Sequence, residues 1–516
     1  MLPILERLFA EDSYWRLIVD QAYMTCAIQN WEYRGAGTEE DPYVIGWIDN
    51  DRRNPTNLAP WIKWGIVVII SFNALAVSFV PSACSGALPK IMRHFEISEV
   101  VGTLGLSLYV LGFGVGPLLW APLSEVYGRQ VILCTSYGVL TLFNLGVVFS
   151  QNVQTLLILR FFAGTFGASP LTNTGGVIVD IFTPADCGIA MNLFAVAPFM
   201  GPAAAGWRWA CGLMTLLCGI SWLLSTVLIP ETFAPVLLRR RAERLSKMTG
   251  KIYVTQFDKT RGQPSLWSDI KPIVLALAVY MSIIYGTLYL LFGAYPFVFK
   301  GARGWSDGIA NLPFLGILVG MLFGIAFNIW DNRRYVGIVQ THRQAPPEAR
   351  LLPAMVGAVI LPIGQSWFAW TNYPSIAWIC PVIASSFFGF SMILIFVSGK
   401  NYLADLYTIF AASALASTVL LRSIFGAVFP LLTPYVFRNL GIHWASSIPA
   451  FLSVACAGFP FVFHRYEAWI RKRCKFSQAA NIYSEELHNL RSRSERKRNG
   501  RGLLYGESDK MRLGDG

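Results

Sequence analysis

The first group of ionisable residues that could carry a function lies in a short predicted turn. Ser124 to Arg129 reads Ser-Glu-Val-Tyr-Gly-Arg and separates two long apolar runs. Glu125, Gly128 and Arg129 thus place a carboxylate, a glycine and a guanidinium beside a bilayer, where charges are costly unless they pair. Asp180 ends a later apolar run on the same side, so we expect an Arg129–Asp180 ion pair strengthened by partial dehydration. The alternative is a solvated surface pair worth under ~1 kcal/mol.

Two arginines fall inside apolar runs. Arg160 lies more than a turn inside the run over 155–179, and Arg422 lies deep in the run over 407–432. A charge at such depth costs roughly 2.5–3.5 kcal/mol on insertion scales, which makes each arginine a functional candidate. Structural roles are also open. Arg160 could bond backbone carbonyls of the next span, and Arg422 could clamp neighbouring helices near their outer ends.

Membrane helices must position these residues. Hydrophobic residues make up 54% of the chain, charged residues 14%, and the mean hydropathy is +0.47. An ordinary soluble domain carries about 25% charge. A hydrocarbon core of about 30 Å needs roughly 20 apolar residues per helix, and this composition and these run lengths predict an all-α polytopic membrane protein. The predicted spans are 64–84, 99–121, 131–149, 155–179, 189–206, 209–229, 272–298, 309–330, 351–370, 375–399, 407–432 and 443–463.

The twelve spans divide at the longest internal polar stretch into two groups of six. Such a layout is typical of folds in which two halves rock around a central site. We predict an N-terminal tail at 1–60, a six-helix half at 61–238, a central loop at 239–270, a second six-helix half at 271–465 and a basic tail at 466–516. The two halves share short similar segments. For example, the polar segment after the eighth predicted span, Asn328 to Tyr335, resembles the turn after the second predicted span.

Basic residues cluster on one side of the predicted spans. They follow the sixth span from Arg239 to Lys251 and the twelfth from Arg471 to Lys475. The positive-inside rule then predicts that both termini are cytosolic. The run from Arg491 to Arg501 is expected to lie near anionic membrane lipid rather than to bind nucleic acid. Residues 1–60 lack the apolar core of a signal peptide, so the first span is expected to direct insertion.

The sequence offers little for catalysis or metal binding. Its nine cysteines are scattered without a C-x-x-C pair, and its five histidines form no H-E-x-x-H motif. No phosphate-cradling glycine loop of the Walker type is present either. We therefore expect no metal, no cofactor and no enzymatic activity.

Aromatic residues of the seventh and tenth spans are candidates for a central cavity. Such side chains bind planar, amphipathic or cationic organic molecules with little directional bonding. Packing between helices is the more common use of these residue types, and it remains an alternative at each position. The cavity candidates are Asn73, Tyr280, Tyr285, Tyr289 and Phe387, with Phe388 beside the last.

Several segments together resemble one known family. Gly116 to Arg129, Gly-Pro-Leu-Leu-Trp-Ala-Pro-Leu-Ser-Glu-Val-Tyr-Gly-Arg, resembles the cytoplasmic loop signature of the major facilitator superfamily. The sequence of this segment is similar to that of the twelve-span drug:proton antiporters of fungi. The resemblance covers roughly residues 44–476. Its other segments are Asn54–Asn57, Leu159–Gly164, Ala197–Pro202, Pro230–Phe233, Leu237–Ala242, Pro346–Leu351, Tyr402–Asp405 and Ala412–Ser423.

The resemblance implies the major facilitator fold and a secondary active transporter. Its substrates would be small organic molecules such as drugs, toxins or secondary metabolites, exported in exchange for protons by a monomer in the plasma or vacuolar membrane. Arg160 would take part in proton coupling, with Arg422 as a second candidate. The Arg129–Asp180 pair, with Glu125 beside it, would close a cytosolic gate. The antiporter motif would contain Pro198, Gly201 and Pro202.

The fifth span departs from the family pattern. After Pro202 the pattern normally continues through another Gly-Pro and a Gly-Gly, whereas this chain passes through three alanines to Gly206. About 18 residues remain, or ~27 Å at 1.5 Å per residue, which is barely a crossing. A missed exon would explain the gap as well as an adapted bundle would. A transport-inactive, receptor-like member therefore stays open. A polyamine or nutrient transporter is also an alternative, because it would share the same fold.

Overall fold

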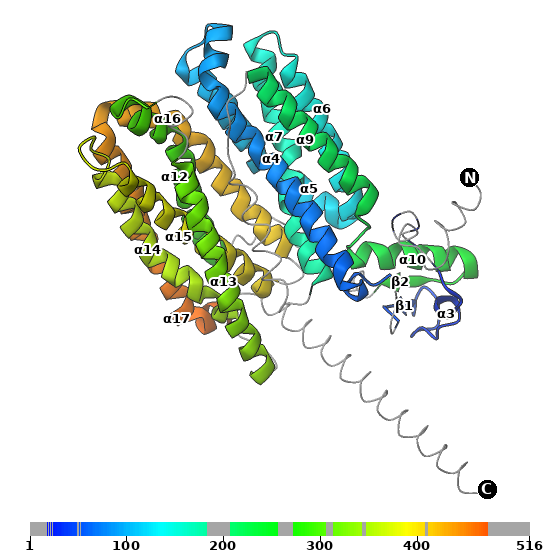
Figure 1. Ribbon diagram of the computed structural model, residues 1–516. Helices are drawn as coiled ribbons and strands as arrows, with labels where there is room; N and C mark the ends of the chain where they lie inside the picture. The colour runs from blue at the N-terminus through cyan, green and yellow to red at the C-terminus, as the bar shows by residue number, and fades with distance from the viewer. Residues whose placement is uncertain are drawn as a thin grey trace, which may run out of the picture.

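Two bundles of long helices lie side by side in the computed structural model (Figure 1). The first bundle holds the helices from α4 to α9, and the second holds those from α12 to α17. Long apolar runs favour helices in lipid, because a helix satisfies its own backbone N–H and C=O groups where no water is present. The structure describes Ile18, Asp20 and Ala22 and residues 24–48, 51, 53–182, 207–255, 272–305, 313–342, 347–407 and 411–472.

The structure describes five long helices in the first bundle, and polar side chains cap the N-termini of two of them. The Ser98 hydroxyl accepts the N–H of Val101 at the start of α5, and the Asn152 side chain accepts that of Thr155 at the start of α7. Such caps satisfy N–H groups that have no partner within the helix. The helices are α4 (Pro60–Phe95), α5 (Glu99–Tyr127), α6 (Arg129–Val148), α7 (Val153–Ile181) and α9 (Trp207–Leu228).

The second bundle contains a helix that bends sharply near its middle. Gly441, with φ 73° and ψ 169°, breaks α16 (Ala411–Cys456) into two antiparallel arms. Only glycine adopts this conformation at little cost, so Gly441 marks the turn between the predicted eleventh and twelfth spans. The other elements are α12 (Pro272–Tyr295), the π-helix η3 (Pro296–Ala302), α13 (Phe314–His342), η5 (Pro347–Leu351), α14 (Leu352–Trp370), α15 (Ile379–Tyr407) and α17 (Gly458–Lys472).

The predicted spans agree with these helices to within a few residues at most edges. Within the described residues, ten helical stretches are long and apolar enough to cross a membrane, and one of them, Thr418–Tyr466, contains both arms of α16. The predicted fifth span at 189–206 lies outside the described residues. The same holds for the antiporter-motif residues Pro198, Gly201 and Pro202.

Glycines allow close helix packing inside each bundle. A Cβ on Gly164 of α7 would overlap the backbone of Tyr109 in α5, and a Cβ on Gly320 of α13 would overlap Ser386 in α15. Close approach of this kind replaces the hydrophobic effect as a source of helix association in lipid. The α5–α7 contact fixes the position of Asp180 relative to the end of α5.

The N-terminal segment and the central loop form one small folded unit. The strand β1 (Tyr43–Ile45) pairs in parallel with β2 (Tyr253–Thr255), and both pack on α10 (Ala234–Thr249), beside α3 (Cys26–Gln29) and η1 (Pro55–Asn57). The Arg241 guanidinium of α10 donates to Asp51 at 2.6 Å, with both side chains almost fully buried. We call this unit the α10 cap. It lies at one end of the first bundle (Figure 1), which we call the α10 end.

Candidate functional site

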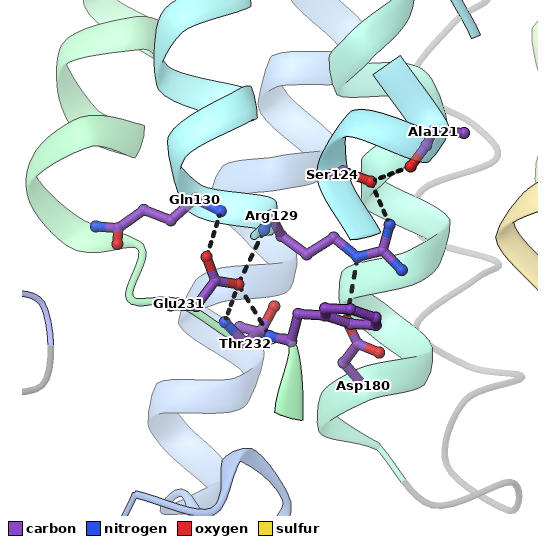
Figure 2. Close-up of polar contacts among 8 residues, drawn as sticks. Ala121, Ser124, Arg129, Gln130, Asp180, Glu231 and Thr232 are labelled. Atoms are coloured by element: carbon purple, nitrogen blue, oxygen red, sulfur yellow. Dashed lines mark hydrogen bonds and ion pairs between the residues drawn. The ribbon is translucent and has the colours of Figure 1, made fainter. Parts of the chain in front are cut away.

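Arg129 joins the end of α5 to the end of α7. Its Nε donates to the Asp180 carboxylate at 3.4 Å, and its Nη1 donates to the Ser124 hydroxyl at 2.6 Å. The guanidinium also lies 4.7 Å from the centroid of the Phe233 ring, a cation–π contact. Figure 2 shows the side chain extended along this path between the two helices. The sequence therefore predicted the ion pair correctly.

Glu231 holds the backbone of the same turn. Its carboxylate accepts the N–H groups of Arg129 at 2.9 Å and of Gln130 at 3.2 Å, the first two of α6 (Figure 2). It also accepts those of Thr232 and Phe233. A carboxylate at a helix N-terminus satisfies unpaired donors and complements the helix dipole. Sequence reasoning noticed Glu231 only as part of a family marker and gave it no role.

Two glycines make room for these charged groups. Gly128 has φ 102°, and a Cβ there would overlap the Glu231 carboxylate. A Cβ on Gly176 of α7 would come within 2.9 Å of the central carbon of the Arg129 guanidinium. Larger residues at either position would displace the ion pair or its backbone support. We call Ser124, Gly128, Arg129, Asp180 and Glu231 the turn cluster.

Asp180 lies two residues beyond the apolar span Val153–Ile178 of α7. Burial raises the pKa of this carboxyl to about 7, although the nearby Arg129 charge lowers it; Glu231 and Glu125 raise it further. Desolvation penalises the ionised form, and the single guanidinium compensates only partly. Asp180 can therefore change its protonation state near neutral pH. Glu125 is half-buried in the last turn of α5 and contributes its charge to this balance.

A second polar cluster lies in the C-terminal half of α13 in the other bundle. Asp331 accepts from Arg334 at 2.8 Å, and Arg334 also donates to the Ala349 carbonyl at 2.7 Å. Arg350 donates to Asn332 at 3.0 Å and lies 3.5 Å from the centroid of the Tyr335 ring. This segment is the one that the sequence matched to the turn after the second span. Both bundles thus carry an arginine–carboxylate cluster near their second long helix. The first follows α5, whereas Asp331 and Arg334 lie inside α13, which continues as a helix to His342 where the sequence predicted the end of a span at 330.

Arg160 is almost fully buried in α7 and contacts two other helices. Its guanidinium donates to the Val80 carbonyl of α4 and to the Cys211 sulfur of α9, each at 3.5 Å. Among described residues it therefore meets the first and sixth spans. The expected neighbour, the fifth span, lies outside the described residues. The thiol of Cys211 is a weaker acceptor than a carboxylate.

Two of the aromatic candidates lie together beside Arg422. The hydroxyls of Tyr285 and Tyr289 are 3.3 Å apart. The Arg422 guanidinium lies 4.8 Å from the centroid of the Tyr285 ring and 5.5 Å from that of Phe396. These residues come from α12, α15 and α16, so three helices meet around one half-buried cation.

The other three candidates are placed elsewhere. Asn73 is fully buried against α9, where its amide bonds to the hydroxyls of Ser221 and Ser225. Tyr280 packs edge-on against Phe459 of α17, and Phe387 is 37% exposed beside Trp367. Tyr280 shares a buried hydrophobic cluster with Tyr285 and Tyr289, whereas Asn73 and Phe387 have other neighbours. The assignment of all three to a cavity stays a prediction.

Comparison with known proteins decides the family. The sequence matches the model of the Major Facilitator Superfamily over residues 67–430. The chain belongs to the major facilitator superfamily. The multidrug transporter mdrA of Aspergillus fumigatus is 52% identical in an alignment of 499 positions that covers 92% of this chain and 82% of that protein. The efflux pump MFS2 of Trichophyton rubrum is 48% identical, over 93% of this chain and 85% of that protein.

Solved structures support the superfamily fold. The proton:xylose symporter XylE, bound to a bromodeoxyglucose, superposes with a TM-score of 0.59 at 14% identity, over 78% of this chain and 96% of that one. The human organic anion transporter MFSD10 gives a TM-score of 0.55 at 14% identity, over 78% of this chain and 100% of that one. As a major facilitator protein, the chain is a multi-pass membrane transporter for small molecules.

Proposed function

We propose that this transporter exports small organic molecules in exchange for protons by alternating access. Its relatives are named a multidrug transporter and efflux pumps. The single structural observation that carries the proposal is the turn cluster, in which one arginine links α5, α6 and α7 through Asp180 and Glu231. The α10 end would face the cytosol, as the basic residues that follow the sixth span suggest.

The turn cluster would act as the cytosolic gate. Its bonds fix the shape of the turn within the first bundle, so the turn moves as one body when the bundles rock. At the opposite end, the Arg438 side chain of α16 donates to Glu99 of α5 at 2.6 Å and bridges the two bundles. That pair is largely exposed, so it is weak and can separate as the outer side opens.

Arg160 and Asp180 are the proposed proton-coupling residues. Asp180 has a pKa of about 7 because it is buried, so it can take up or release a proton under cellular conditions. Arg160 is a buried cation whose guanidinium donates to a carbonyl and to a thiol. Its positive charge would lower the pKa of any titratable group that comes close to it during the transport cycle.

Accumulation of a fluorescent substrate in a drug-sensitive fungal host tests export. Cells with the chain should accumulate less dye than cells with an empty vector, and a protonophore should remove the difference. Arg160→Ala should abolish gradient-driven efflux while the protein still reaches the plasma membrane. Equal accumulation with wild type and empty vector, in cells where the protein is seen at the membrane, contradicts export. That result would favour the receptor-like reading suggested by the short fifth span.

A further inference from the structure

The interior of the second bundle contains a small cavity between four helices. Its walls come from α12, α14, α15 and the part of α16 that follows Gly441. All four helices belong to the second bundle, so the cavity does not lie between the two bundles. The centres of water-sized spheres can occupy about 20 Å³ of it. One water molecule needs ~10–15 Å³ by this measure, so the cavity has room for one.

Two polar side chains in the cavity wall have no hydrogen-bond partner within the part of the chain that the structure describes. Gln365 of α14 is 5% exposed, and neither its amide oxygen nor its amide nitrogen is paired. Ser446 of α16 is also 5% exposed, and its hydroxyl is unpaired. Both residues lie in stretches that are long and apolar enough to span a membrane, where lipid cannot supply a partner. Burial of unpaired polar atoms is costly, which favours a bound group inside the cavity.

The other polar side chains in the cavity wall are already paired. Ser385 of α15 accepts a hydrogen bond from the Tyr295 hydroxyl at 2.6 Å and donates to a backbone carbonyl of its own helix at 2.8 Å. Thr287 of α12 also donates to a carbonyl of its own helix, at 2.8 Å. Among the side chains of this wall, the unpaired atoms are thus confined to Gln365 and Ser446, which lie on two helices that pack together.

The chemistry of the cavity wall favours a small neutral ligand. No ionisable side chain of the described residues lines it, so nothing would offset the cost of burying a charge there. The amide and the hydroxyl offer both donors and acceptors, and water pairs with either kind. Pro449, also in the wall, has no N–H and cannot donate to the Ala445 carbonyl, its usual acceptor in a helix. That carbonyl belongs to the residue before Ser446 and is one more acceptor without its usual helical donor.

We propose that one buried water molecule bridges Gln365 of α14 and Ser446 of α16. The water pairs with the amide and with the hydroxyl, and it links the two helices inside the second bundle. A polar pair that is bridged in this way stabilises the bundle, whereas the same pair in a dry cavity destabilises it. The proposal rests neither on the direction of transport nor on proton coupling.

Thermal unfolding of the purified full chain distinguishes a hydrated cavity from a dry one by the sign of a Tm shift. If water bridges the two residues, Gln365→Met and Ser446→Ala should each lower the Tm by roughly 2–4 °C, since each removes a partner of the water. The double variant should lose little more than one single variant does, because the bridge is already broken. Ser385→Ala is the matched control in the same wall. Its hydroxyl is paired within the protein, so its Tm loss should add to that of Gln365→Met.

A dry cavity predicts the reverse. Replacement of an unpaired buried amide or hydroxyl by an apolar group would then leave the Tm unchanged or raise it. Such a result for both single variants, or Tm losses that add in the double variant, overturns the water bridge.

Hydroxyl-radical footprinting of the wild type tests the site even if the variants do not fold. X-rays convert bound water into radicals that oxidise the side chains beside it, including buried ones. Phe368 in the cavity wall should be oxidised several-fold faster than Phe299, which is buried in the same bundle but does not line the cavity. Equal rates for the two rings contradict a water molecule in this cavity.

Discussion

Gly128 turns the chain directly beside the carboxylate of Glu231, at a φ of 102° that only glycine adopts readily. The two residues are separated by about a hundred positions in the sequence, yet Glu231 accepts the two N–H groups that follow Gly128. The shape of the turn after α5 therefore depends on the end of α9. This relationship connects the Arg129–Asp180 ion pair to the α10 cap.

Gly128→Ala should abolish transport. The added Cβ would force both a strained φ and an overlap with the Glu231 carboxylate, so the turn and Arg129 would shift. Dye efflux in the drug-sensitive host is the measurement, at equal protein level in the membrane. Gly212→Ala in α9 is the matched control, because a Cβ there meets nothing within 4 Å. Efflux by Gly128→Ala equal to that of the control contradicts this account.

Glu231→Gln should destabilise the protein by ~1–3 kcal/mol. The amide keeps one acceptor oxygen but puts a donor against backbone N–H groups, and it removes the charge that complements the N-terminus of α6. Thermal unfolding of the purified protein measures the loss. Glu243→Gln on the exposed face of α10 should leave the stability unchanged. A Tm for Glu231→Gln equal to that of Glu243→Gln would refute the anchoring role.

Asp180 should make stability depend on pH below neutrality. Its pKa rises from 3.8 to about 7 on folding because the carboxyl is buried, so the folded chain binds this proton more tightly than the unfolded chain does. Stability from this residue is therefore lost as the pH rises from about 4 to about 7, and changes little above that. Asp180→Asn removes this dependence, so its Tm should fall less than that of the wild type between about pH 5 and pH 7. Parallel curves would show that Asp180 does not titrate there.

The α10 cap should depend on a buried ion pair. Arg241→Ala would leave Asp51 buried without its guanidinium, and such a loss costs about 3–5 kcal/mol. Arg244→Ala, which breaks an exposed pair with Asp20, should cost under ~1 kcal/mol. Limited proteolysis within residues 24–48 measures opening of the cap. If the two variants were cut at the same rate, the cap would not be held by Arg241.

The sequence predicted the helices well because each span is a long apolar run with clear ends. It also predicted the Arg129–Asp180 pair, since a membrane surface leaves a charged turn few partners. It assigned no role to Glu231, whose contacts are with backbone N–H groups that carry no sequence signature. It grouped Asn73 with the cavity because an apolar helix with one amide does not reveal which neighbour that amide faces. In the structure, Ser221 and Ser225 of α9 bind it.

Transport driven by an imposed pH gradient in inside-out vesicles tests the central claim most directly. Vesicles with an acidic lumen contain the chain, and uptake of a fluorescent substrate is followed as protons leave. We expect uptake that nigericin abolishes, and rates at least tenfold lower for Arg129→Gln and for Arg160→Ala, because each removes a charge that gating or coupling requires. Uptake that persists without the gradient, or that both variants support at the wild-type rate, would contradict proton-coupled export through the turn cluster.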